Sequence, residues 1–260
     1  MKWDQNYALT SDEKGNAYLY GTFENYSEVT VKYREAALTT HTFSQATESA
    51  KSYALDATVI SANSAEEINS AIKQEVADGK TAIRLNIASD AGDNEFKAIR
   101  EAFKNVKSGT IDLTLIGCKE IPADGLNDIK ALKSIFLPDV TKIGMNALSY
   151  CVNLQEICAP NVSAIDERAF AGFIMLTKVT LGELTDVRGE ANSGGGIFDD
   201  DKRILIDLYL PKNQEVMKGE FDENSNQYIW KPTGESYFAS LDYDNRIFLG
   251  YQFNSVKSWE

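Results

Sequence analysis

The residues best suited to catalysis are few and scattered. His41 is the only histidine among the 260 residues, and it lies in a threonine-rich stretch. A serine or cysteine nucleophile needs a nearby base, which is most often histidine, and zinc-type metal sites need clustered histidine and cysteine ligands. We therefore expect a non-enzymatic chain with no catalytic residue and no histidine-based metal site.

The three cysteines form no redox or metal-binding motif. Cys118, Cys151 and Cys158 are unevenly spaced, and none stands in a CxxC arrangement. Cys118 and Cys151 fall at apolar positions of the pattern described below, and a free cysteine packs as a small apolar side chain. We expect those two to be buried, and Cys158 to lie on an outward side with no base to activate it.

Two acidic runs and one glycine run could bind ions or phosphate, but their spacing argues against it. The runs at 199–201 and 90–95 lack the spacing of a calcium loop. The glycines at 194–196 lack the Lys-Ser/Thr of a P-loop and the spacing of a dinucleotide fingerprint. We predict no metal and no cofactor, while a pair of carboxylates for glycoside hydrolysis stays open, because only geometry would select it.

Composition and charge limit the partners. Hydrophobic residues make up 43% of the chain and charged residues 25%, as in globular proteins, and the net charge is −13. Nucleic acid and anionic lipid would repel such a chain at long range. The first thirty residues contain no apolar run of seven, so we expect neither a signal peptide nor direct membrane insertion by this chain.

A repeat of 22 residues must position any binding residues in the middle of the chain. Leu132, Leu154 and Leu176 begin three copies, and positions 4, 6, 9 and 12 are apolar in each. A copy precedes them from Thr110, and a weaker one follows from Leu205. A fixed period of this length indicates a solenoid, because one copy cannot bury its own apolar face and stacked copies can.

Each copy contains the signals of one solenoid coil. Positions 4 and 6 alternate with polar residues, which predicts a short strand. Pro138, Pro160 and Pro211 end this strand at position 7, because proline cannot donate to a central ladder. Positions 9 to 12 predict a second short strand or turn, and the rest of each copy predicts a helical turn.

The repeat pattern L..I.LP.V..I...A[LF]..C..L, with Asn153 before Leu154, resembles the BspA-like leucine-rich repeats of bacterial cell-surface proteins. The resemblance covers residues 110–226. It implies an α/β leucine-rich-repeat solenoid that is secreted or exposed at the cell surface. It also implies protein binding, namely adhesion to host matrix proteins or to another cell surface.

The flanks of the repeats predict three parts of the chain. Residues 1–54 form an N-terminal β-containing segment, with strands at 17–23 and 28–36, followed by a polar linker. Residues 55–226 form the repeat domain, in which 55–109 are helical capping coils and 110–226 are five repeats. Residues 227–260 form an aromatic-rich, β-rich C-terminal cap.

Local signals place elements in these flanks. A capping box from Ser64 to Glu67 predicts a helix over 64–77, and Asp93 is the expected N-cap of a second amphipathic helix. Alternation predicts a strand over 83–87 and a β-hairpin or small sheet around Asp244-Asn245. The nine aromatic residues of 227–260 either cover the last coil or form an exposed platform for a glycan or protein.

The outward columns of the first strand carry our contact hypothesis. Position 5 holds Thr114, Phe136, Cys158, Thr180 and Tyr209, and position 3 holds Asp112, Ser134, Glu156, Lys178 and Asp207. Exposed aromatics beside charges are typical of interfaces. The predicted ligand-binding residues are Phe136, Tyr209, Glu156, Lys178, Ser134 and Thr180.

Other interpretations remain open on the sequence alone. A terminal segment of the chain could cover Phe136 and Tyr209. A surface glycan-binding protein, or a glycan hydrolase with its site in the flanking segments, is the main alternative function. An intracellular scaffold or a purely structural solenoid would also fit.

Overall fold

The structure, a computed structural model, describes residues 28–33, 36–42, 59–191, 195–198 and 203–259. The chain divides into two units, residues 1–33 with 37–55 and residues 34–36 with 56–260. The first unit contains a two-stranded sheet of β1 (Glu28–Tyr33) and β2 (Ala36–Thr42). β2 includes His41, so the expected linker does not begin at Thr39, and its part beyond Thr42 lies outside the described residues. The strand expected at 17–23 lies outside the described residues.

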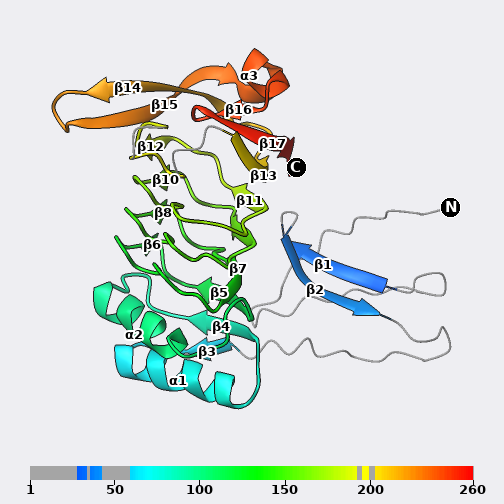
Figure 1. Ribbon diagram of the computed structural model, residues 1–260, viewed down its shortest axis with the longest axis vertical. Helices are drawn as coiled ribbons and strands as arrows, with labels where there is room; N and C mark the ends of the chain where they lie inside the picture. Colours follow the sequence, from blue (N-terminus) through cyan, green and yellow to red (C-terminus); the bar gives the residue numbers. More distant parts are fainter. Residues whose placement is uncertain (1–27, 34–35, 43–58, 192–194, 199–202, 260) are drawn as a thin grey trace. The chain divides into compact units, whose positions relative to one another are not determined.

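The second unit winds through successive coils, most of which give one strand to each of two sheets (Figure 1). The nine-stranded sheet has the order β16-β17-β13-β11-β9-β7-β5-β4-β3, and the six-stranded sheet has the order β14-β15-β12-β10-β8-β6. The first strands of the coils are β3 (Val59–Ser61), β4 (Ala82–Asn86), β5 (Ile111–Ile116), β7 (Leu132–Phe136), β9 (Glu156–Ala159), β11 (Lys178–Leu181) and β13 (Arg203–Leu210). The second strands are β6 (Glu120–Ile121), β8 (Lys142–Ile143), β10 (Ala164–Ile165) and β12 (Asp186–Arg188).

Parallel pairing brings equivalent residues of neighbouring coils side by side. In the nine-stranded sheet Ile157 lies between Ile135 and Val179. In the six-stranded sheet Ala164 pairs with both Lys142 and Asp186. Each of these partners is 22 residues away in sequence, so the sequence period and the strand register agree.

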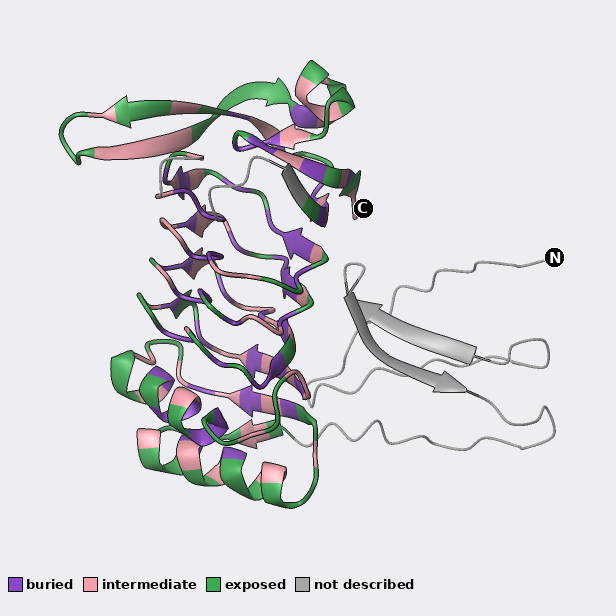
Figure 2. Cartoon of the chain, in the orientation of Figure 1, coloured by how far each residue is buried: buried purple, intermediate pink, exposed green. Residues whose placement is uncertain are grey.

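The core lies between the two sheets and is filled by the periodic apolar positions (Figure 2). The side chains at positions 4, 6, 9 and 12 of the three central copies are all buried. Full burial of one such aliphatic side chain is worth about 1.5–3 kcal/mol. The stacked coils therefore obtain from each other the apolar burial that a single coil lacks.

The third side of each coil is built from turns. Asp124, Asn146 and Arg168 at position 15 have φ values of 53–56°, and Tyr150 at position 19 has a φ of 59°. A left-handed backbone conformation at positions 15 and 19 interrupts any right-handed helix between them. The helical turn expected in each repeat is therefore wrong.

Two helices precede the regular coils. The helix α1 (Ala65–Ala77) begins after Ser64, whose Oγ accepts from the Glu67 N–H at 3.3 Å, as predicted. The helix α2 (Asp93–Phe103) begins after Gly92, whose N–H donates to Glu95 Oε2 at 3.0 Å. Asp93 is therefore the first helical residue and not the N-cap, because the extended residue is Gly92. The buried faces of the two helices carry Ile68, Ile72, Phe96, Ile99 and Phe103.

The weak last copy contributes only its first strand. Leu208 and Leu210 of β13 are buried, as expected. After Pro211 the chain leaves the coil path and forms the antiparallel hairpin of β14 (Glu215–Asp222) and β15 (Gln227–Ser236). Phe221, expected in the core, is 58% exposed. The predicted burial of Phe221 is wrong because the hairpin replaces the second half of a coil, and its side chains alternate between the two faces of the strand.

The chain then returns to the nine-stranded sheet. A 3-10 turn (Tyr237–Ala239) and the short helix α3 (Leu241–Asp244) lead to β16 (Ile247–Phe248) and β17 (Tyr251–Ser258). The expected hairpin exists, but it turns at Leu249-Gly250 and not at Asp244-Asn245. Leu249 and Gly250 both have positive φ values, 50° and 77°, as the two central residues of a type I′ turn require.

Candidate functional site

The outward columns of the first strands form two rows across the nine-stranded sheet. The position-3 row runs through Asp112, Ser134, Glu156, Lys178 and Asp207, and the position-5 row runs through Thr114, Phe136, Cys158, Thr180 and Tyr209. We call these two rows together the outer face. The register places every residue of the hypothesis on it, within two neighbouring rows.

Polar contacts connect neighbouring members of the position-3 row. Ser134 Oγ donates to Asp112 Oδ1 at 2.6 Å, and Lys178 Nζ lies 2.8 Å from Glu156 Oε1. At the C-terminal end of the row, Asp207 accepts from Ser255 Oγ at 2.7 Å. This hydrogen bond is the main reason why the pKa of Asp207 lies below its ordinary value. The row is therefore a chain of charged and hydroxyl groups held in place by in-register neighbours.

Tyr209 lies between two ammonium groups. Lys178 Nζ is 5.4 Å from the centroid of the ring, and Lys257 Nζ is 5.5 Å from it. Both distances are within the range of a cation–π interaction. The two lysines hold the ring in one orientation. Because Tyr209 is half-buried, part of the ring stays accessible.

Two members of the position-5 row do not face solvent as expected. Thr180 is fully buried, and Cys158 is only 1% exposed. The register gives a physical reason, because these short side chains stand side by side, flanked by the larger Phe136 and Tyr209. Thr180 Oγ1 has no hydrogen-bond partner among the described residues. The expectation of an exposed Cys158 is wrong, and Thr180 offers no accessible surface to a ligand.

The structure adds residues that the repeat pattern did not reveal. Arg84 of β4 lies beside Thr114, and Lys257 of β17 lies beside Tyr209, so both extend the position-5 row. Asn254 Nδ2 also donates to Asp207 at 2.6 Å. No sequence signal pointed to Asn254 and Lys257, because they lie outside the 22-residue repeat and only strand pairing brings them to the outer face.

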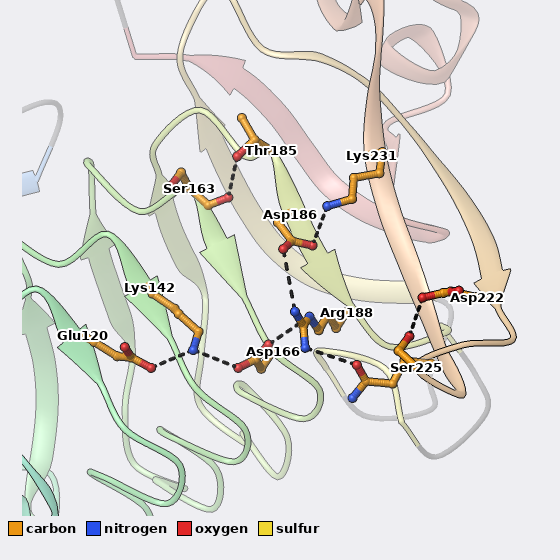
Figure 3. Close-up of polar contacts among 11 residues, drawn as sticks. Glu120, Lys142, Ser163, Asp166, Thr185, Asp186, Arg188, Asp222, Ser225 and Lys231 are labelled. Carbon is orange, nitrogen blue, oxygen red and sulfur yellow. Dashed lines mark hydrogen bonds and ion pairs between the residues drawn. The ribbon is translucent and has the colours of Figure 1, made fainter.

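A second charged row crosses the six-stranded sheet (Figure 3). Lys142 Nζ lies 2.7 Å from Glu120 and 3.7 Å from Asp166, and Arg188 Nε lies 3.5 Å from Asp166. The hydrogen bond to Glu120 is the main reason why the pKa of Lys142 is above its ordinary value. Since opposite charges alternate along this row and already pair with each other, it serves the stacking of coils.

The C-terminal aromatics form packed clusters. Among the nine, Tyr237, Phe248, Tyr251 and Phe253 are buried and the other five are half-buried. Tyr237 has edge-on ring contacts with Phe238, Tyr243 and Phe248. The four buried rings therefore cannot belong to a glycan platform, whereas the five half-buried rings keep part of their surface accessible.

Cys118 and Cys151 have the environment of core residues. Both are fully buried, and burial raises the pKa of each thiol to about 12. In the part of the chain that the structure describes, no three His, Cys, Asp or Glu side chains group to hold a metal ion. The run at 90–95 therefore adds no ligand cluster, and the run at 199–201 lies outside the described residues.

Comparison with known proteins identifies the repeats. No helix within the described ranges has the length and apolar character needed to cross a membrane. A family model described as a BspA type leucine-rich repeat region matches residues 94–194, in six copies. Searches of curated proteins and of solved structures found no match. The matched stretch begins in α2, ends after β12 and includes four strands of the nine-stranded sheet and four of the six-stranded sheet, so residues 94–194 of this chain match leucine-rich repeats of the BspA type.

Proposed function

We propose that this chain is a non-catalytic binding protein that recognises a protein ligand through the outer face. The observation that carries the proposal is the arrangement around Tyr209, whose half-buried ring lies between Lys178 and Lys257 and beside a row of charged groups. An aromatic ring held by its neighbours loses little conformational entropy on binding, and interfaces are enriched in such side chains.

The set of contact residues follows from burial. Phe136, Tyr209, Glu156, Lys178 and Ser134 are half-buried and keep accessible surface, whereas Thr180 does not. The first five therefore stay in the proposal, and Lys257 joins them. They carry one acidic and two basic groups and lie beside Asp207, which favours a ligand whose charges are also mixed.

Location and biological role rest on the family. The BspA type is associated with bacterial surface proteins that adhere to host matrix proteins and to other cells. We place this chain outside the cell or at its surface on that ground. We also assign the helices of 55–109 and the strands of 227–260 to covering the first and last coils, since a solenoid must shield its terminal apolar faces.

The test is binding of the purified chain to arrays of host matrix proteins and of glycans. The informative variant is Phe136→Ala with Tyr209→Ala, which removes ring area from the outer face. The matched control is Ile174→Ala with Met175→Ala, which removes exposed apolar area elsewhere, because these side chains are 76% and 49% exposed in a turn.

Loss of protein binding in the first double variant alone, with an unchanged melting temperature, would support the outer face. Protein binding that both variants retain would place the site elsewhere. Glycan binding that the first variant leaves untouched would overturn the proposal in favour of a glycan-binding protein.

A further inference from the structure

The strand β14 is one edge of the six-stranded sheet. It pairs with β15 on one side, and no strand of the described residues pairs with its other side. Figure 1 shows β14 and β15 as a long hairpin that extends sideways beyond the stacked coils. An edge strand of eight residues offers a row of backbone donors and acceptors to another strand.

The register shows which backbone groups face the free edge. The Tyr228 carbonyl of β15 accepts from the Gly189 N–H on the β12 side, at 2.8 Å. Successive residues of a strand turn their backbone groups to opposite sides, so Ile229 faces β14, and its partner Glu220 faces β15. The N–H and C=O groups of Met217, Gly219 and Phe221 therefore point to the free edge. The Gly219 carbonyl already accepts from Tyr228 Oη at 3.1 Å, and its second lone pair can accept from another strand.

The side chains next to this edge are self-complementary. Two antiparallel copies of β14 centred on Gly219 would exchange backbone hydrogen bonds at the three outward-pointing residues. Lys218 would then face Glu220 of the partner subunit in a non-hydrogen-bonded pair, where Cα atoms are only about 4.5 Å apart. Phe221, which is 58% exposed, would lie opposite the partner's Met217, which is only 6% exposed, so the backbone hydrogen bonds and charge pairs carry the contact.

Charges on an edge strand usually prevent pairing, but here their order favours one arrangement. The side chains of Lys218 and Glu220 are 70% and 71% exposed and pair with each other at 2.7 Å within one chain. The two-fold arrangement joins each to an opposite charge, and such cross-strand pairs are favourable whereas like charges are not. The net charge of −13 opposes less specific association.

We propose that two copies of this chain associate through antiparallel pairing of their β14 strands about Gly219. The two six-stranded sheets become continuous, and the dimer presents two outer faces. This goes beyond the proposed ligand-binding function and does not depend on it, because the residues involved belong to different sheets. A dimer would bind a surface-attached ligand more tightly than a single chain, through a raised effective concentration.

Sedimentation velocity of the full chain over a wide concentration range tests the proposal. The salt concentration should be about 0.15 M, where charges more than about 8 Å apart are screened. We expect a concentration-dependent equilibrium between monomer and dimer. Lys218→Glu and Glu220→Lys each bring two pairs of like charges together, so each should weaken dimerisation about tenfold or more.

Mixing the two variants supplies the decisive comparison. An equal mixture of Lys218→Glu and Glu220→Lys chains forms opposite charge pairs in the mixed dimer, and should regain wild-type affinity. Lys212→Glu, an exposed site outside β14 with the same change in net charge, should leave the dimer intact. A monomeric wild type, a dimer insensitive to both reversals, or a mixture that stays monomeric would overturn the proposal.

Discussion

The side chain of Gln214 forms hydrogen bonds with both backbone groups of Leu184. Its Oε1 accepts from the Leu184 N–H at 2.8 Å, and its Nε2 donates to the Leu184 carbonyl at 3.3 Å. Gln214 is fully buried just after the point where the chain leaves the coil path. One amide side chain thus provides partners for both backbone groups of a residue at the end of the regular coils.

Gln214→Leu should destabilise the protein strongly. Leucine keeps the volume but leaves the Leu184 N–H and C=O buried without partners, which costs about 3 kcal/mol for the two groups. Urea unfolding followed by circular dichroism measures the loss. The control is Asn213→Ala, which removes a surface contact to Glu183 and should change the free energy of unfolding by less than about 1 kcal/mol. Equal effects of the two substitutions would contradict this role of Gln214.

Stability should fall as the pH rises above about 9. The pKa of the Cys118 and Cys151 thiols is raised from 9.0 to about 12 in the folded chain. The unfolded chain therefore loses these protons first, and the associated stability, complete below pH 9, is lost progressively between about pH 9 and 12. At pH 10 each thiol should account for about 1.4 kcal/mol of destabilisation.

Cys118→Val isolates one thiol in this pH dependence. Valine already occupies the same column of the repeat at Val140 and Val162, so the variant should fold. Between pH 8 and 10 the free energy of unfolding should decrease for both proteins. The decrease should be about 1.4 kcal/mol smaller for the variant than for the wild type. Identical pH profiles for the two proteins would show that burial of Cys118 does not control its ionisation.

Gly172→Ala should destabilise the third side of a coil. Gly172 has a φ of 77°, and an added Cβ would lie 2.5 Å from Cδ1 of Tyr150. Left-handed strain and this overlap together should cost about 2 kcal/mol. Gly92→Ala is the matched control, since its Cβ would meet nothing closer than 3.9 Å, and the poorer N-cap should cost less than about 1 kcal/mol. Thermal unfolding of both variants provides the comparison, and a Gly172→Ala chain as stable as the control would refute the strain.

Much of the solenoid could be predicted from the sequence because the repeat encodes it locally. Apolar residues at four fixed positions determine which side chains turn inward, and stacking then fixes the 22-residue register, as Ile135, Ile157 and Val179 show. The helix after Ser64 was also predictable, because its N-cap signal lies within four residues.

The sequence-based predictions are wrong where the structure depends on an unusual backbone conformation or on pairing between strands distant in sequence. Leu249 adopts a positive φ that its residue type disfavours, so composition pointed to Asp244-Asn245 as the turn instead. For the outer face, alternation predicted the direction of Thr180 correctly but not its burial, which depends on neighbours from other strands. Lys257 reaches Tyr209 only through strand pairing between distant parts of the chain.

The parallel stacking of the coils also has an evolutionary consequence. Neighbouring strands lie about 4.8 Å apart, so the nine-stranded sheet measures about 38 Å across its strands. Duplication or deletion of one 22-residue unit would lengthen or shorten it by one strand spacing and leave the register of the other coils unchanged. The reach of such a protein towards a ligand can thus change in discrete steps, without redesign of its core.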